Sequence, residues 1–257
     1  MLRLMTYNIL EGGGPPRRQR LLLEVLERLS PDLLVVNEAV DWHPRHPAAD
    51  RIAAALGYSY RVARSASGFD VAIFSRCPIV EFHQPEIPQL FHSAARLTVE
   101  TPSGRRLHVV GTHLDYREEA LRVKEVEALL PHVAPLLETD AAILGDLNAI
   151  APDDSVMGLA AQALSEVDLQ TAPDWFAKRY PPQALARLLE AGWCDAFRLR
   201  HGLRSGYTMS TSDPNARYDY VLVSPSLAGR VRDVIVETAP PASNASDHFP
   251  VVADIDV

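Results

Sequence analysis

The sequence predicts an α/β domain with a mixed β-sheet, and three features of the chain favour this class. Short apolar runs bounded by turn residues recur from one end of the chain to the other. Segments with helical spacing of apolar residues lie between several of these runs. In the middle of the chain, Thr101-Pro102-Ser103-Gly104 is a good turn sequence between two neighbouring runs. The 257 residues contain no fixed-period repeat or biased linker, so we expect a single domain over residues 1–257.

The expected strands are the apolar runs. The first alternates apolar and polar residues, whereas residues 33–36 are continuously apolar, which is typical of a strand buried on both faces. The runs cover residues 2–10, 32–37, 71–75, 97–100, 107–111, 141–145, 218–224, 231–236 and 251–257.

The expected helices cover residues 17–29, 48–56, 117–130 and 184–191. In the first, Leu22, Val25 and Leu29 share one helical face, and Ser30-Pro31 ends the pattern. A further segment, residues 174–180, carries aromatic and basic residues. These residues could stack a base and bind phosphate, although ordinary helix packing is the favoured interpretation.

The charge balance limits the possible functions. The formal net charge is −8, whereas proteins that hold long stretches of nucleic acid usually have a basic surface. This charge leaves room for a local basic cleft or for a small phosphorylated substrate. The two cysteines, Cys77 and Cys194, are too few for a disulfide framework and are expected to be reduced thiols.

The N-terminal residues lack the apolar stretch and the cleavage site of a signal peptide. No segment approaches the roughly 20 consecutive apolar residues that a transmembrane helix needs. We therefore expect a cytoplasmic location, without membrane insertion, and no feature indicates an obligate protein partner.

Polar residues cluster where the predicted strands begin or end. Taken singly, each has an ordinary explanation, since Asp and Asn cap turns and a lone His is usually structural. Taken together, they could converge on one edge of the sheet, because open α/β sheets bind ligands at strand ends. The set comprises Asn8, Glu38, His113, Asp115, Asp146, Asn148, Asp219, Asp247 and His248.

The residue types in this set indicate a chemistry. Carboxylate and amide oxygens are hard ligands that suit Mg²⁺ or Mn²⁺ rather than zinc. Histidines supply proton transfer and hydrogen bonds near neutral pH. A divalent cation, a base and hydrogen-bond donors together are what hydrolysis of a phosphate ester requires.

Seven short motifs in order give the chain a resemblance to a known family. They are Thr6-Tyr7-Asn8-Ile9, Asn37-Glu38, Ser75-Arg76-Cys77-Pro78, Gly111-Thr112-His113-Leu114-Asp115, Leu144-Gly145-Asp146-Leu147-Asn148, Arg217-Tyr218-Asp219-Tyr220-Val221 and Ser246-Asp247-His248-Phe249-Pro250. With them, the chain resembles the endonuclease/exonuclease/phosphatase superfamily over essentially its whole length. The resemblance implies the DNase I-like fold, a four-layer α/β/β/α sandwich of two mixed sheets with its site at one end.

The resemblance implies a metal site and a base. Glu38 would be the principal ligand of Mg²⁺ or Mn²⁺, with Asn8 beside it and Asp247 in the same cluster. Asp146 resembles the residue that orients or deprotonates the attacking water. The number of metal ions and the identity of the general base stay open.

The resemblance also implies contacts with the phosphate. His248 would contact the phosphate, with Asp219 fixing its tautomer. His113 would be a second phosphate-binding or acid group, and Asn148 would hold a phosphate oxygen. Arg217, in the motif that contains Asp219, is expected to contact the substrate.

Two positions depart from the family pattern. Asn37 stands where Gln is common, which we expect to alter a hydrogen bond behind the site rather than the chemistry. Asp70 stands where small residues are frequent, and the sequence assigns it no role.

Relatives in this family act on diverse phosphate esters, and loops set the substrate. We therefore expect a divalent-metal-dependent phosphodiesterase or phosphatase that acts on a phosphorylated small molecule or a nucleic acid. The alternatives are a nuclease specific for DNA or RNA ends or abasic sites, and a catalytically weak member that only binds. Loss of Glu38, Asp146 or His248 would indicate the weak member, and all three are present.

Overall fold

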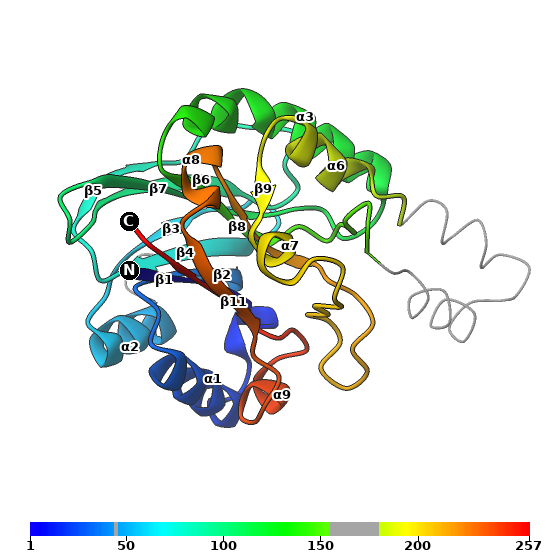
Figure 1. Cartoon of the computed structure of the whole chain (residues 1–257). Coiled ribbons are helices and arrows are strands. Elements are labelled where there is room, and N and C mark those ends of the chain that lie inside the picture. Colours follow the sequence, from blue (N-terminus) through cyan, green and yellow to red (C-terminus); the bar gives the residue numbers. More distant parts are fainter. Residues whose placement is uncertain (44–45, 155–179) are drawn as a thin grey trace, which may run out of the picture.

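Two six-stranded sheets stack face to face at the centre of the computed structural model, which describes residues 1–43, 46–154 and 180–257 (Figure 1). The first sheet contains β1 (Leu2–Asn8), β2 (Leu33–Val40), β3 (Ser59–Ala63), β4 (Phe69–Ser75), β11 (Val231–Val236) and β12 (Val251–Ile255), in the order β11-β12-β1-β2-β4-β3. The second contains β5 (Ile79–His83), β6 (Ala94–Glu100), β7 (Arg106–His113), β8 (Ala141–Asp146), β9 (Cys194–Asp195) and β10 (Asp219–Val223), in the order β5-β6-β7-β8-β10-β9.

Helices cover the outer faces of both sheets (Figure 1). Outside the first sheet lie α1 (Pro16–Leu29), α2 (Pro47–Leu56) and the short α9 (Ala242–Ala245), and outside the second lie α3 (Glu119–Val133) and α6 (Gln183–Glu190). Shorter elements are η1 (Glu11–Gly13), η2 (Ala134–Glu138), α7 (Ala196–His201) and α8 (Pro225–Ala228). The predicted four-layer sandwich of two mixed sheets is confirmed.

Alternating side chains of the central strands fill different layers of the core. In β2, Val35 points into the core between the sheets, and its neighbour Val36 packs under α1 and α2. In β7, Val109 and Val110 divide in the same way between the inner core and the layer under α3 and α6. Burial on both faces explains why these strands are continuously apolar in the sequence.

Most predicted elements are found within a few residues of their expected bounds. The helix expected over residues 117–130 differs most, because α3 continues through Pro131 to Val133. The strands β3 and β5 were not predicted; both mix exposed and half-buried residues, which weakens the apolar pattern. Residues 174–179 of the aromatic and basic segment lie outside the described residues. Among the residues that the structure describes, no helix combines the length and apolar character needed to cross a bilayer.

Two parallel strand pairs bring the polar strand ends together. β1 runs parallel to β2, with Asn8 opposite Asn37, and β7 runs parallel to β8, with His113 opposite Asp146. β10 is antiparallel to β8 and places its first residue, Asp219, opposite Asp146. One end of the sandwich therefore collects polar side chains from both sheets.

The absence of a side chain at Gly145 sets the approach of β8 to β7. A Cβ atom at Gly145 would lie 1.8 Å from the carbonyl oxygen of Thr112, which is far inside contact distance. Its φ of 157° also lies outside the range that L-residues usually adopt. Glycine is therefore required directly before Asp146.

Candidate active site

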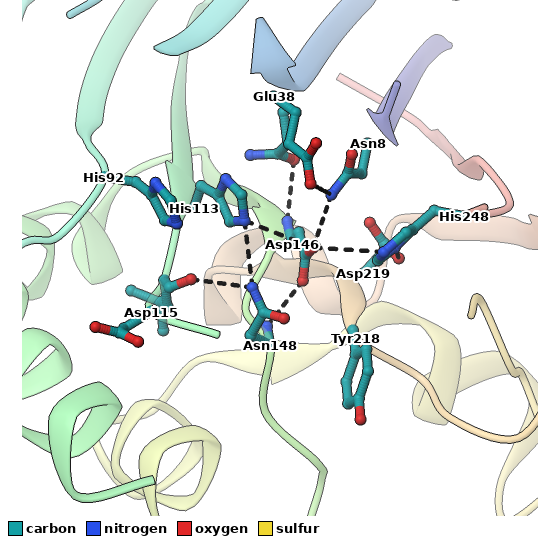
Figure 2. A network of polar contacts seen from close by, with 12 residues as sticks. Asn8, Glu38, His92, His113, Asp115, Asp146, Asn148, Tyr218, Asp219 and His248 are labelled. Carbon is teal, nitrogen blue, oxygen red and sulfur yellow. Dashed lines mark hydrogen bonds and ion pairs between the residues drawn. The ribbon is translucent and has the colours of Figure 1, made fainter. Parts of the chain in front are cut away.

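Asn8 links the two sheets at the polar end of the sandwich (Figure 2). Its Nδ2 donates to Glu38 Oε1 at 3.0 Å and to Asp146 Oδ2 at 2.9 Å. Its Oδ1 accepts from the backbone N–H of Leu10 at 3.0 Å. Since that N–H can only donate, the amide orientation is fixed with its nitrogen toward the two carboxylates.

A β-bulge turns Glu38 into the site. The pairing of β2 with β4 shifts register between Val36 and Ala39. Glu38 lies in this bulge with a φ of 58°, a left-handed conformation that is uncommon for a residue with a side chain. The surrounding structure maintains such a conformation at a cost, which is frequent at functional sites. The second carboxylate oxygen, Oε2, accepts from the backbone N–H of Glu11 at 2.7 Å.

Asp146 lies at the centre of the cluster and is almost completely buried. Its Oδ1 accepts from the backbone N–H of Asn148 at 2.8 Å, and its own N–H donates to Asn37 Oδ1 at 3.0 Å. Burial raises the pKa of Asp146 to about 7, against the opposing effect of the nearby His248 imidazolium, while the Asp219 carboxylate raises it further. Asp146 is thus a carboxylate that takes up a proton close to neutral pH.

His248 pairs with Asp219. The distance from His248 Nδ1 to Asp219 Oδ2 is 2.8 Å, and both side chains are buried. The other ring nitrogen, Nε2, lies 3.8 Å from Asp146 Oδ2. Burial alone would lower the pKa of His248, but the carboxylates of Asp219 and Asp146 outweigh it and raise the pKa to about 10. His248 is therefore an imidazolium at neutral pH.

His113 faces the same carboxylate from another direction. Its Nε2 lies 3.7 Å from Asp146 Oδ2 and 3.2 Å from Asn148 Nδ2. That amide nitrogen also donates to the carbonyl oxygen of Leu114 at 3.0 Å, which fixes its orientation and makes His113 Nε2 the acceptor. Burial lowers the pKa of His113 well below 6.5, and His92 and His248 lower it further. This histidine is therefore neutral.

Three side chains of the cluster lie close enough together to hold a metal ion. Atoms of Asp146, Asp219 and His248 that can ligate a metal all lie within 4.8 Å of one another, although His248 would have to lose a proton to do so. Asp219 Oδ1 is buried and has no hydrogen-bond partner among the described residues. A buried carboxylate oxygen without a partner is costly, and a cation or a water molecule would satisfy it. The carboxylate of Glu38 is joined to that of Asp146 through Asn8, so a third carboxylate lies beside this group.

This group of three differs from the ligand set that the sequence predicted. Asn8 directs its N–H groups toward the carboxylates, and its Oδ1 accepts from the Leu10 N–H, away from Asp146 and Glu38. Asp247 is half-buried, and its Oδ1 lies 3.3 Å from Ser246 Oγ. Only Glu38 of the predicted set presents a carboxylate held within the hydrogen-bonded cluster.

The structure does not bring Arg217 to this cluster. Its guanidinium group is buried and bonds Asp195 Oδ2 at 2.6 Å and Asp154 Oδ1 at 3.1 Å. It also lies over the ring of Tyr220, with 4.5 Å between Cζ and the ring centroid. A buried guanidinium is stable only when its charge is paired, and Asp195 and Asp154, which are distant from Arg217 in sequence, pair this charge. Asp115 likewise pairs with Arg117 instead of joining the cluster.

Two residues of the site were not identified from the sequence as parts of it. Asn37 was noted only as a departure from the family pattern, but its amide joins β2 to the second sheet by bonding the Thr112 carbonyl oxygen and the Asp146 N–H. His92 stacks on His113 with 4.0 Å between ring centroids. No motif surrounds His92, so no sequence signal could have singled it out.

The sequence and the fold of the chain were compared with those of known proteins. The sequence profile described as "Endonuclease/Exonuclease/phosphatase family" matches residues 5–248. No curated protein sequence matches. Among solved structures, the chain is similar to an AP endonuclease from Archaeoglobus fulgidus, with 21% identity, full coverage of both chains and a TM-score of 0.77.

Two further structures share the fold. One is the 3′ phosphatase NExo from Neisseria bound to a product DNA hairpin, with 24% identity, full coverage of both chains and a TM-score of 0.75. The other is a mannosyl-6-phosphatase from Bacteroides thetaiotaomicron, with 17% identity, full coverage of both chains and a TM-score of 0.71. The matched profile spans nearly all of the sequence, so this chain belongs to the endonuclease/exonuclease/phosphatase family.

Proposed function

We propose that this protein is a phosphoesterase that depends on Mg²⁺ or Mn²⁺ and hydrolyses a phosphate ester by means of an activated water. One observation carries the proposal. Oδ2 of the buried Asp146 accepts from Asn8, which also bonds Glu38, and lies 3.8 Å from Nε2 of His248 and 3.7 Å from Nε2 of His113. Buried carboxylates beside an imidazolium supply the base, the metal-binding oxygens and the positive charge that hydrolysis of an anionic phosphate ester needs.

In this proposal, Asp146 orients the water and takes its proton. His248 binds a phosphoryl oxygen through Nε2–H, while Asp219 holds Nδ1 and so fixes the ring. The His248 imidazolium already carries both of its ring protons, so it can stabilise the negative charge of the phosphoryl group directly.

His113 and Asn148 are hydrogen-bonded to each other beside Asp146. Asn148 donates to both His113 Nε2 and the Leu114 carbonyl oxygen, so its Oδ1 is the atom left to receive a hydrogen bond. A phosphoryl oxygen only accepts hydrogen bonds, so His113 would contact it through the tautomer that carries a proton on Nε2, which ends the bond from Asn148. The Asn148 N–H group released in this way would then donate to the phosphoryl group beside His113.

The carboxylates of Glu38, Asp146 and Asp219 are the residues that would hold the cation. A bound Mg²⁺ or Mn²⁺ would neutralise charge on the phosphoryl group and make a nearby water more acidic. Whether Asn8 and Asp247 also serve as ligands stays a prediction.

The substrate class is narrowed by charge. A formal net charge of −8 favours a small phosphorylated substrate over a long nucleic acid. The fold alone does not decide, because structures of similar fold include a DNA 3′ phosphatase and a mannosyl-6-phosphatase. The assembled cluster of Glu38, Asp146 and His248 argues against a member that only binds.

The test is a panel of phosphate esters, beginning with bis-p-nitrophenyl phosphate and p-nitrophenyl phosphate. We expect turnover with Mg²⁺ or Mn²⁺, loss of turnover in EDTA, and recovery when either cation is added back. Abasic DNA, RNA and phosphorylated sugars then define the substrate. Absence of turnover across the panel in protein that binds Mn²⁺ would refute the proposal.

Glu38→Gln tests the ligand role. The variant removes one charge of the donor set, so we expect the Mg²⁺ concentration for half-maximal activity to rise at least roughly tenfold. Glu24→Gln, at an exposed position on α1, is the matched control and should leave the Mg²⁺ dependence unchanged. Wild-type behaviour of Glu38→Gln at low Mg²⁺ would contradict the assignment.

A further inference from the structure

A second histidine lies directly on the ring of His113 (Figure 2). His92, in the segment that leads into β6, is buried, and its ring is stacked on that of His113 with planes 12° apart and centroids 4.0 Å apart. The proposed reaction gives His92 no direct contact with the phosphate. Its place beside a residue of the site nevertheless requires an explanation.

Hydrogen bonds fix the ring of His92. Its Nδ1 lies 2.9 Å from Ser67 Oγ, and Ser67 Oγ lies 2.6 Å from Ser65 Oγ. The backbone N–H of Ser65 donates to Oδ1 of the buried Asp70 at 2.7 Å. Asp70, which the sequence left without a role, thus anchors the loop between β3 and β4 that holds His92.

Aromatic edges enclose the same ring. Phe69 meets His92 with centroids 5.6 Å apart and planes at 63°, and Phe91 meets it at 4.7 Å and 68°. These edge-to-face contacts are favourable for aromatic rings. His92 is therefore held from several sides before His113 contacts it.

His113 lacks the support that a catalytic histidine usually has. Such a histidine normally bonds a carboxylate or carbonyl through its second nitrogen, which fixes the ring, as Asp219 does for His248. Nδ1 of His113 is buried and has no hydrogen-bond partner among the described residues. Its orientation must depend on something else.

We propose that His92 is a positioning residue that sets the plane of the His113 ring through their stack, with Ser67 holding His92 in place. The stack restricts tilt of the His113 ring, and the bond between Nε2 and Asn148 restricts rotation within the plane. The two contacts together direct Nε2 toward Asp146. This inference rests on the proposed function, in which His113 acts at the phosphate.

A neutral partner suits this role. Burial lowers the pKa of His92 to about 4, so its ring adds no charge beside His113 at neutral pH. A carboxylate at the same place would instead favour the imidazolium form of His113. A stacked neutral ring orients His113 and leaves it uncharged.

The test uses His92→Ala, which removes the stack, and His92→Phe, which keeps a flat ring. Small displacements of reacting groups cost up to roughly a hundredfold in rate. We expect His92→Ala to lower kcat roughly 10- to 100-fold with KM changed less than about threefold, and His92→Phe to recover most of kcat. Equal losses in the two variants would overturn the proposal. His108→Ala, on the same strand as His113 but bonded to Thr98, is the matched control for loss of a histidine.

A double-mutant cycle separates positioning from general packing. If His92 acts through His113, then His92→Ala should cause no further loss of kcat in a His113→Ala background. Additive losses would overturn the proposal. Ser67→Ala keeps both rings and removes one hydrogen bond, so it should lower kcat about two- to fivefold and remains informative even if His92→Ala does not fold.

Spectroscopy tests the inference without turnover. Long-range ¹H–¹⁵N spectra report the tautomer and surroundings of the His113 imidazole, and we expect them to change in His92→Ala and to stay close to wild type in His92→Phe. Unchanged His113 resonances in His92→Ala would overturn the positioning role. If the wild-type protein hydrolyses no phosphate ester, the proposed function fails, while these spectra still decide the role of His92.

Discussion

His113 and His248 approach the site from two sides and differ in charge, although both face the carboxylate of Asp146. Nε2 of His113 and Nε2 of His248 lie 3.7 Å and 3.8 Å from the same oxygen of Asp146. Burial disfavours the charged form of both rings. It lowers the pKa of His113, whereas at His248 the nearby carboxylates outweigh it and raise the pKa to about 10. The neighbours differ, because His248 is hydrogen-bonded to the carboxylate of Asp219, whereas His113 is hydrogen-bonded to the neutral Asn148 and stacked on His92. Partners, rather than depth, set the charge of a buried histidine.

The largest predicted effect is the loss of activity on removing the His248 ring, which should exceed the loss on removing the His113 ring. We expect His248→Ala to lower kcat/KM by about 10³-fold, since it removes a fixed cation, and His113→Ala by about 10- to 100-fold. Steady-state kinetics at saturating Mg²⁺ on an ester that the wild type hydrolyses would measure both losses. Equal losses would mean that the difference in charge has no consequence for turnover.

Asp219→Asn should lower the pKa of His248 and so bring it closer to the low pKa of His113. Without this carboxylate, the pKa of His248 falls from about 10, and the alkaline limb of the pH–rate profile moves to lower pH. The raised pKa also contributes stability that is complete below about pH 6.5 and is lost as the pH rises through about 10. Thermal melts across this range should therefore show a smaller pH dependence in the variant.

Asp213→Asn provides the control for this change, because it removes an exposed acid from the same segment of the chain. It should leave the alkaline limb in place. An alkaline limb that does not move in Asp219→Asn would show that some group other than His248 titrates there.

The smallest predicted effect concerns Asn37, and it should not distinguish the His113 side of the site from the His248 side. Asn37→Ala leaves the Thr112 carbonyl and the Asp146 N–H without their partner, which costs about 2 kcal/mol, or about 5 °C in Tm for a chain of this length. Differential scanning calorimetry would measure the loss, and Asn37→Gln, which keeps the amide, should lose less. A Tm unchanged in Asn37→Ala would show that this link between the sheets contributes no stability.

The strands that carry the site could be predicted because burial on both faces requires a continuous run of apolar residues, as at Val35 and Val36. The bulge that turns Glu38 inward could not, since it exists only relative to the pairing of β2 with β4. Arg217 lay in a recognised motif, but the two acids that pair with it are distant in sequence. Contacts of this kind leave no local pattern, and the same is true of His92.

Gly145 has a consequence for engineering. Because the contact between β7 and β8 beside Asp146 is between main-chain atoms, the pairing of these strands sets where the main chain of Asp146 lies. Loops that contribute no residue to the site could then be exchanged with those of a related protein while this strand pairing is kept. The position itself tolerates no substitution, so libraries aimed at new specificity should leave it fixed.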